Sequence, residues 1–173
     1  MTRVLLGLGS NLDNRQKLLL QAIQKVSQKI GKPLDYSSIY ETAPLYYTEQ
    51  PDFLNMAISV QTELTPHSLL NNCLKIESQL GRTRTSEQNR ARRIDIDVLY
   101  YGKRIINEDK IQIPHPKIKE RKFVLTPLNE IVPHLIDPQN GNTIRQLYNN
   151  CPDNSRVRLY LSRQKLEINL DSA

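Results

Sequence analysis

The chain has 173 residues, of which 38% are hydrophobic and 24% are charged. This length fits one domain with a substantial core, and the composition is that of a globular protein rather than a disordered one. The formal net charge of +6 favours an anionic partner, either a nucleic acid or a phosphorylated small molecule.

Two further features of the composition bear on the compartment. No apolar run approaches the roughly 20 residues that span a bilayer, and the apolar part of residues 1–7 is too short for a secretory signal. Cys73 and Cys151 lie far apart and form no CxxC pair, which suits a reducing compartment and disfavours a zinc site. We therefore expect a cytoplasmic protein with no membrane partner. We also expect a monomer.

The N-terminal part of the chain predicts a strand, a helix and two more strands. Residues 4–9 are an apolar run typical of a strand, and Gly9-Ser10-Asn11 at its end is a turn signal. Residues 13–30 carry apolar side chains at helical spacing. Residues 36–42 are β-branched and aromatic and predict one strand. Residues 54–61 alternate between apolar and small or polar side chains, so one face of this strand belongs to the core.

The middle of the chain predicts a second helix and another strand. Thr65-Pro66 is a helix start, and Gly81 supplies the stop. A basic stretch, residues 82–93, then leads into a strand over residues 94–101. The order of elements is βαββαβ, which predicts an open sheet with helices packed on it, an α+β fold.

The remainder is rich in proline and less regular. We predict short helices at residues 127–131 and 143–148 and a last strand at residues 157–161. The domain is expected to span residues 1–162, with residues 163–173 forming a poorly ordered tail.

Asp95 and Asp97 are the first residues that can carry chemistry. Side chains at positions i and i+2 of a strand point to the same face, so both carboxylates project together, while Ile94, Ile96 and Val98 face the core. Two carboxylates this close repel each other unless a cation lies between them. Oxygen ligation suits magnesium, which takes one or two carboxylates and completes its shell with water and phosphate oxygens. The same alternation also fits a plain amphipathic strand with a solvated face.

Five arginines precede this pair, at Arg82, Arg84, Arg90, Arg92 and Arg93. Guanidinium groups bind phosphate oxygens in two-point geometry and always stay charged. Carboxylates that hold a metal, together with nearby arginines, are what phosphoryl transfer requires. A solvated basic loop or a nucleic-acid patch remains an alternative interpretation of the arginines alone.

A third group lies in the proline-rich part of the chain and comprises Lys110, His115, Arg121 and Phe123. A lone histidine more often has a structural role than a catalytic one. The prolines on both sides of His115 fix its backbone, which suits a residue that positions a ligand.

Several separated motifs follow one another along the chain. They are Gly9-Ser10-Asn11-Leu12, Tyr40-Glu41-Thr42, Gln50-Pro51-Asp52-Phe53-Leu54-Asn55, Ile76-Glu77, Leu80-Gly81-Arg82, Arg92, Asp95-Ile96-Asp97, and Pro114-His115 with Arg121. Together these motifs resemble the 6-hydroxymethyl-7,8-dihydropterin pyrophosphokinase family of folate biosynthesis. The resemblance runs in order from about Arg3 to Leu161. It implies a ferredoxin-like α+β fold with an open, mainly antiparallel sheet, and transfer of pyrophosphate from ATP to the pterin alcohol, giving AMP and the pterin diphosphate.

The resemblance also implies a role for each matching residue. The catalytic residues would be Arg82, Arg92, Asp95 and Asp97, with Asp95 and Asp97 as ligands of two magnesium ions. The residues around ATP would be Glu77, Arg84, Val98, Lys110, His115 and Arg121. The pterin would be bound by Thr42, Leu45, Phe53, Asn55 and Phe123. Phe53 and Phe123 are the two phenylalanines of the chain, and without the resemblance ordinary core residues would be the simpler interpretation of both.

The sequence departs from the family's pattern in the basic loop. Where the family usually carries Trp-Gly-Pro-Arg, this chain has Asn89-Arg90-Ala91-Arg92. Asn89 lacks the flat surface of an indole that could cover the site, and Arg90 adds a charge. We expect the change to affect loop closure and affinity more than the reaction itself.

Two rival readings lead to different functions. A ferredoxin-like nucleic-acid module would use the basic loop, but Asp95 and Asp97 would repel a phosphate backbone, so we expect no nucleic-acid partner. A degenerate paralogue would bind pterin or ATP without efficient turnover, and kinetics would separate it from an active enzyme.

Overall fold

A computed structural model describes residues 1–45, 48–82, 91–166 and 168. The main sheet consists of β1 (Thr2–Ser10), β2 (Lys32–Tyr36), β3 (Ile39–Thr42), β4 (Phe53–Thr62), β5 (Asp95–Tyr101) and β8 (Val157–Leu161). The α-helices are α1 (Arg15–Lys29), α2 (Pro66–Gln79), α3 (Lys122–Ile131) and α4 (Ile144–Asn149). A separate hairpin is formed by β6 (Ile106–Glu108) and β7 (Ile111–Ile113), and two short 3-10 helices are η1 (Ile118–Glu120) and η2 (Arg163–Lys165).

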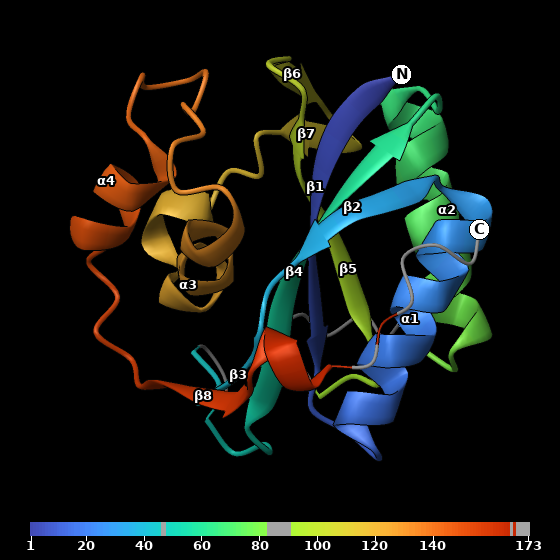
Figure 1. Ribbon diagram of the computed structural model, residues 1–173, viewed down its shortest axis with the longest axis vertical. Helices are drawn as coiled ribbons and strands as arrows, with labels where there is room; N and C mark the ends of the chain where they lie inside the picture. Colours follow the sequence, from blue (N-terminus) through green and yellow to red (C-terminus); the bar gives the residue numbers. More distant parts are fainter. Residues whose placement is uncertain (46–47, 83–90, 167, 169–173) are drawn as a thin grey trace.

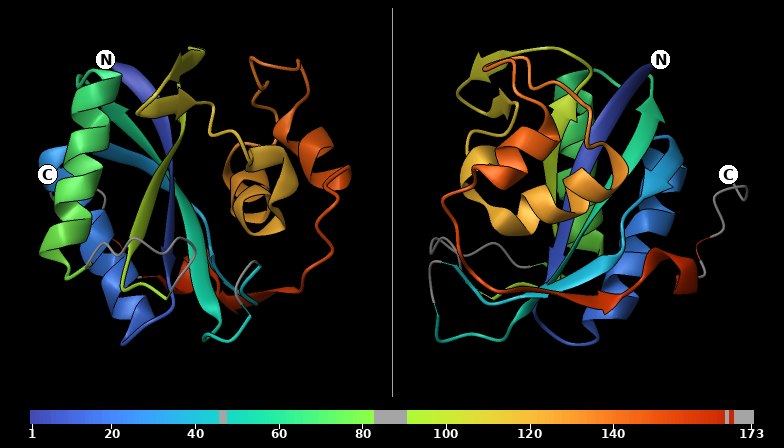
Figure 2. Two further views of the ribbon diagram at one scale, coloured as in Figure 1. Left: turned by 180° about the vertical axis from the view of Figure 1, so that it is seen from behind. Right: turned by 60° about the vertical axis from the view of Figure 1, so that its left-hand side comes forward.

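The sheet is the middle layer of three. Its strand order is β5-β1-β4-β3-β8, with β2 also paired to β4, and every pairing is antiparallel. Helices α1 and α2 cover one face, and α3 and α4 lie on the other (Figure 1). Figure 2 shows the same separation from two further sides. The predicted α+β fold with a ferredoxin-like βαββαβ core is confirmed.

Two hydrophobic cores fill the spaces between the layers. The first lies under α1 and α2 and takes the side chains of Leu54, Met56, Ile58 and Val60 from β4. This is the apolar set that the alternation predicts. The second core lies under α3 and α4 and includes Leu5, Ala57, Leu99, Tyr100, Leu125 and Leu128. Because α3 covers part of the sheet face opposite α1 and α2, the small side chains that β4 directs to that face are buried as well.

Strand β5 contains an irregularity that the alternation does not predict. The register with β1 shifts between Leu5 and Leu6. As a result Leu99 and Tyr100, two consecutive residues, both belong to the second core, and Tyr101 returns to the first. A β-bulge has this effect, because it adds one residue to a strand.

Several element boundaries differ from the prediction. Residues 36–42 are not one strand: β2 ends at Tyr36, and β3 begins at Ile39. The break is stabilised by Ser37, whose N–H donates to the Ala57 carbonyl and whose hydroxyl accepts from the Ala57 N–H. Gly9 does not lie in a turn, because β1 continues through Ser10.

Helix α3 begins earlier than predicted, at Lys122, and includes Pro127 in its interior. A proline there removes one backbone hydrogen bond, while Val124, Leu125 and Leu128 of the same helix are buried. The β6–β7 hairpin was not predicted. The helix start at Thr65-Pro66 and the last strand at residues 157–161 are confirmed.

The segment after residue 162 is partly described. Arg163 donates its N–H to the Ser38 hydroxyl, and Leu166 is buried in the first core. The domain boundary at residue 162 stays a prediction. Among the described residues, no helix is both long and apolar enough to cross a membrane.

Candidate active site

The candidate site lies on the face of the sheet that α3 and α4 cover, and β1 runs along its floor. At this point of β1 the residues that face the site are two glycines. Gly7 pairs with Ala57 on one side and Asp97 on the other, and Gly9 pairs with Asn55 and Asp95. Because neither glycine has a side chain, the groups on β4 and β5 face each other across open space. A Cβ atom at Gly9 would lie 2.9 Å from Asn55 Oδ1, so the floor is fitted closely to that amide.

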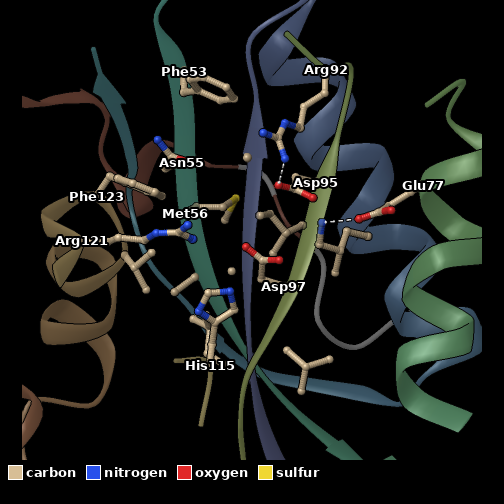
Figure 3. Close-up of a pocket in the computed structure, with 18 of the residues that line it drawn as sticks. Phe53, Asn55, Met56, Glu77, Arg92, Asp95, Asp97, His115, Arg121 and Phe123 are labelled. Atoms are coloured by element: carbon tan, nitrogen blue, oxygen red, sulfur yellow. Dashed lines mark hydrogen bonds and ion pairs between the residues drawn. The ribbon is translucent and has the colours of Figure 1, made fainter. Parts of the chain in front are cut away.

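The two carboxylates lie on the predicted face of β5. Asp95 and Asp97 are partly exposed toward the cavity, while Ile96 and Val98 between and after them are buried. Burial, with the nearby Asp95 carboxylate, raises the pKa of Asp97 to about 7. Figure 3 shows Asp97 projecting into the cavity toward Arg121 and His115. The plain amphipathic strand with a solvated face therefore does not describe this pair.

Asp95 is held by two arginines. Arg82 Nη1 lies 2.5 Å from Asp95 Oδ1, and Arg92 Nη1 lies 2.6 Å from Asp95 Oδ2. The same Arg82 nitrogen lies 2.5 Å from Glu77 Oε1. Glu77 is only 2% exposed and also accepts the Ile96 N–H over 2.8 Å. Two acids and two arginines thus form one compact network of zero formal charge at the entry to β5.

The aromatic half of the site is formed by β4 and α3. Phe53 and Phe123 both line the cavity, and Asn55 lies between their rings in Figure 3. The Asn55 amide nitrogen donates to Thr42 Oγ1 over 2.7 Å. Asn55 is therefore not as free as the sequence suggests, although it still faces the cavity. The Arg92 guanidinium carbon lies 5.9 Å from the centre of the Phe53 ring, so Arg92 connects the aromatic half with Asp95.

The part of the site away from Phe53 contains His115 and Arg121 (Figure 3). Lys117 N–H donates to His115 Nδ1 over 3.2 Å, so in the neutral ring the proton is on Nε2. Burial, together with Arg121, lowers the pKa of His115 to about 4. The ring is consequently neutral at pH 7. The guanidinium carbon of Arg121 lies 5.6 Å from the centre of the Phe123 ring.

The site residues described above, apart from Lys117, line one cavity of about 510 Å³, a volume typical of small-molecule sites. The predicted site residues that line it are Thr42, Leu45, Phe53, Asn55, Glu77, Arg82, Arg92, Asp95, Asp97, Val98, Lys110, His115, Arg121 and Phe123. Arg84 lies outside the described residues, and so do Gln88, Asn89 and Arg90 of the altered loop. Every predicted site residue that the structure describes is therefore brought to the same cavity.

Some lining residues were missed by sequence reasoning. Gly7 and Gly9 carried a signal, because a glycine inside a strand can mark a place where a ligand or another backbone approaches closely. Gln112 carried none, because it lies in the unpredicted hairpin. Gln50 belongs to a motif of the resemblance, but nothing in its type pointed to a role.

The carboxylates on β5 are of the type that magnesium binds, but both oxygens of Asp95 contact Arg82 or Arg92, so a metal on Asp95 would need these arginines to move to the substrate phosphates. Within the described part of the chain, no group of three or more His, Cys, Asp or Glu side chains could hold a metal. A pair of carboxylates is nevertheless enough for magnesium, which commonly shares its shell with substrate phosphates. A cation beside Asp97 would favour its charged form and so offset the burial and the repulsion from Asp95 that raise its pKa.

The sequence is similar to known proteins over most of its length. The family model of 7,8-dihydro-6-hydroxymethylpterin-pyrophosphokinase (HPPK) matches residues 5–133. A 2-amino-4-hydroxy-6-hydroxymethyldihydropteridine pyrophosphokinase of Methylorubrum extorquens is 42% identical over 147 residues, which are 84% of this chain and 91% of that protein. The folic acid synthesis protein fol1 of Pneumocystis carinii is 43% identical over 150 residues, which are 87% of this chain but only 20% of that protein.

The fold is also similar to that of solved structures. The Plasmodium falciparum HPPK-DHPS protein with pteroate superimposes with a TM-score of 0.69 at 20% identity and covers 86% of this chain and 42% of that one. The wild-type protein with SDX-DHP gives a TM-score of 0.68 at 21% identity, over 86% of this chain and 43% of that one. At these identities the likeness supports the fold alone.

Proposed function

Because this chain belongs to the 7,8-dihydro-6-hydroxymethylpterin-pyrophosphokinase family, we propose that it transfers pyrophosphate from ATP to 6-hydroxymethyl-7,8-dihydropterin. The products would be AMP and the pterin diphosphate, in folate biosynthesis. The observation that carries the proposal is that one cavity is lined both by two phenylalanines and by a carboxylate pair with arginines. We further propose a cytoplasmic monomer without a nucleic-acid or membrane partner.

The pterin is proposed to lie between Phe53 and Phe123. A flat heteroaromatic ring gains offset stacking from aromatic side chains on both faces. Asn55 is placed to bind the polar edge of the ring, and its bond to Thr42 fixes the orientation of its amide. Thr42 and Leu45 would contribute backbone groups to the same edge.

ATP is proposed to occupy the half of the cavity lined by Lys110, His115 and Arg121, with its phosphates reaching Arg82 and Arg92. Val98 would offer backbone groups, because its side chain is buried in the first core. Glu77 is too deeply buried for broad contact with a nucleotide and would act by orienting Arg82. Arg84 is included from the resemblance alone.

The reaction needs the pterin hydroxyl in line with the β-phosphorus. The bond from the hydroxyl oxygen to the β-phosphorus forms, the bond from that phosphorus to the oxygen that leaves with AMP breaks, and the hydroxyl proton goes to solvent. Arg92 contacts Asp95 and lies over Phe53, so its charge is placed where the stacked ring meets the phosphates. Two magnesium ions held by Asp95 and Asp97 would neutralise phosphate charge and align the reacting groups.

The first test is incubation of the protein with ATP, magnesium and the dihydropterin alcohol, followed by separation of the nucleotides. Formation of AMP in step with the pterin diphosphate is expected. ADP in place of AMP would indicate an ordinary kinase. Absence of turnover, together with salt-dependent RNA binding, would favour the nucleic-acid module instead.

The second test concerns the carboxylates. Asp97→Ala at saturating magnesium is expected to lower kcat by on the order of 10² or more, because it removes charge stabilisation of the reacting phosphates. Near-normal turnover of this variant would contradict the proposed metal site. Asp109→Ala is a useful control, since Asp109 lines the rim of the same cavity and is not among the proposed ligands.

A further inference from the structure

Asn11 occupies the point where the two halves of the site meet. It directly follows β1, which lies between β5 and β4 and is antiparallel to both. The chain that leaves β1 therefore lies beside the two segments that enter β4 and β5. Those segments lead to Phe53 on one side and to Asp95 on the other.

One side of Asn11 is bonded to Arg92. The Asn11 N–H donates to the Arg92 carbonyl over 3.1 Å, and the Arg92 N–H donates to Asn11 Oδ1 over 2.8 Å. The two residues thus share a closed pair of hydrogen bonds that fixes the Arg92 peptide. The side chain of Arg92 extends from this peptide to Asp95.

The other side of Asn11 is bonded to the segment before β4. Asn11 Nδ2 donates to the Pro51 carbonyl over 3.0 Å and to Gln50 Oε1 over 3.1 Å. Pro51 lies two residues before Phe53 in the chain. Asn11 is only 1% exposed, and its amide uses both of its N–H groups and its oxygen, so its orientation is fixed by three separate partners.

We propose that Asn11 is a positioning residue that holds the arginine–carboxylate half and the aromatic half of the cavity at a fixed separation. Its oxygen positions the Arg92 peptide, and its amide nitrogen positions the segment that carries Phe53. Naming the two halves as ATP and pterin sites rests on the proposed function. Asn11 is not among the residues that line the cavity, so it acts through the two segments.

A purely structural role would have a different signature. If Asn11 only stabilised the fold, each substitution would lower Tm and would affect both ligands to the same degree. A positioning role predicts that the two halves respond separately, because the oxygen serves one half and the nitrogen serves the other.

Two substitutions separate these roles. Asn11→Asp keeps the shape of the side chain and the oxygen that accepts the Arg92 N–H. It replaces the NH2 group, which donates to Pro51 and Gln50, with an oxygen that can only accept. Asn11→Ala removes the three side-chain bonds, to the Arg92 N–H, the Pro51 carbonyl and Gln50 Oε1, and keeps only the backbone bond from its N–H to the Arg92 carbonyl. The matched control is Asn14→Ala in the same loop, since Asn14 Oδ1 only caps α1 by accepting the Lys17 N–H.

The readout is the dissociation constant of each ligand, measured by calorimetry on the full chain with the dihydropterin alcohol and with magnesium and a non-hydrolysable α,β-methylene analogue of ATP. Asn11→Asp is expected to weaken pterin binding about tenfold and to leave the analogue within about threefold. Asn11→Ala is expected to weaken both by about tenfold or more. Asn14→Ala should lower Tm and change neither constant.

The proposal is wrong if Asn11→Asp weakens both ligands equally, or if both Asn11 variants bind like the wild type. Should Asn11→Ala fail to fold, the nearly isosteric Asn11→Asp still decides the question. These measurements need no turnover, so they are separable from the test for AMP. A wild-type protein that binds both ligands but forms no AMP would contradict the proposed function and leave the role of Asn11 measurable.

Discussion

Ile96 and Glu77 are joined by a buried hydrogen bond, in which the Ile96 N–H donates to Glu77 Oε1 over 2.8 Å. Among the described residues, β5 is an edge strand that pairs with β1 alone, and no strand in that part of the chain pairs with the outward N–H of Ile96. A carboxylate from α2 satisfies it, and the same oxygen lies 2.5 Å from Arg82 Nη1. Glu77 therefore binds both the backbone of the edge strand β5 and Arg82, an arginine of the site.

This arrangement predicts a graded effect of two substitutions. Glu77→Gln keeps an oxygen for the Ile96 N–H but loses the ion pair with Arg82, so we expect a loss of about 1–2 kcal/mol in the free energy of unfolding. Glu77→Ala also leaves the N–H without its partner and is expected to cost about 3 kcal/mol or more. Urea unfolding at pH 7 measures both. Equal losses in the two variants would show that the bond to Ile96 contributes nothing.

The glycine floor predicts an effect on pterin binding. In Gly9→Ala the new Cβ would lie 2.9 Å from Asn55 Oδ1, so the amide must move away from its bond with Thr42. We expect the KM for the pterin to rise about tenfold, with the KM for ATP changed less than about threefold. Steady-state kinetics with each substrate varied in turn checks this.

Gly7→Ala is the matched comparison for this prediction. Its Cβ would lie 3.3 Å from Leu99 Cδ1, which is the far end of a flexible apolar side chain. The pterin KM of this variant should stay within about threefold of the wild type. If Gly7→Ala raises the pterin KM as much as Gly9→Ala does, the contact with Asn55 is not the cause.

Much of the site could be predicted because it depends on local alternation. The i and i+2 rule places Asp95 and Asp97 on one face of β5, and the same rule places Phe53 and Asn55 on one face of β4. The rule cannot say which strands are neighbours. That β1 lies between them, with Gly9 opposite both Asn55 and Asp95, follows from pairings between residues far apart in the chain.

The parts that were not predicted depend on tertiary contacts. The break between β2 and β3 is stabilised by bonds from Ser37 to Ala57, and no local pattern encodes them. Helix α3 keeps Pro127 inside because its apolar side chains are buried against the sheet, which outweighs one lost hydrogen bond. Asn11 lies in a motif of the sequence, but its three partners come from two distant segments.

The environment of His115 predicts how stability depends on pH. Burial and the nearby Arg121 lower the pKa of His115 from 6.5 to about 4. Between these two pH values the unfolded chain takes up a proton that the folded chain does not. The contribution of His115 to stability is therefore full above pH 6.5 and declines as the pH falls from 6.5 toward about 4.

Two measurements check this. The ring protons of His115, followed by NMR, should show a titration midpoint near pH 4. The free energy of unfolding should fall less between pH 7 and pH 5 in His115→Gln than in the wild type, because glutamine takes up no proton. A midpoint near the ordinary value for histidine would contradict the buried, neutral ring.

The start of α3 depends on a carboxylate from a distant segment. Arg121 is the N-cap residue and makes no side-chain capping bond. Asp153 Oδ2 instead accepts the Lys122 N–H over 2.9 Å, and its other oxygen accepts the Ser155 N–H over 2.8 Å. An anion at the N-terminus of a helix satisfies a free N–H and interacts favourably with the helix dipole. Since α3 carries Phe123, this contact also supports the aromatic half of the site.

Asp153→Asn is therefore expected to lower the free energy of unfolding by about 1 kcal/mol at pH 7. Burial alone would raise the pKa of Asp153, but the hydrogen bonds from Ser155 and Lys122 together lower it below 3.8. The stabilisation is thus present above pH 3.8 and is lost as the pH falls through the folded-state pKa. Urea unfolding of both proteins from pH 7 down to about pH 3 should show the two curves converging, and a constant difference over that range would show that the charge of Asp153 is not what stabilises α3.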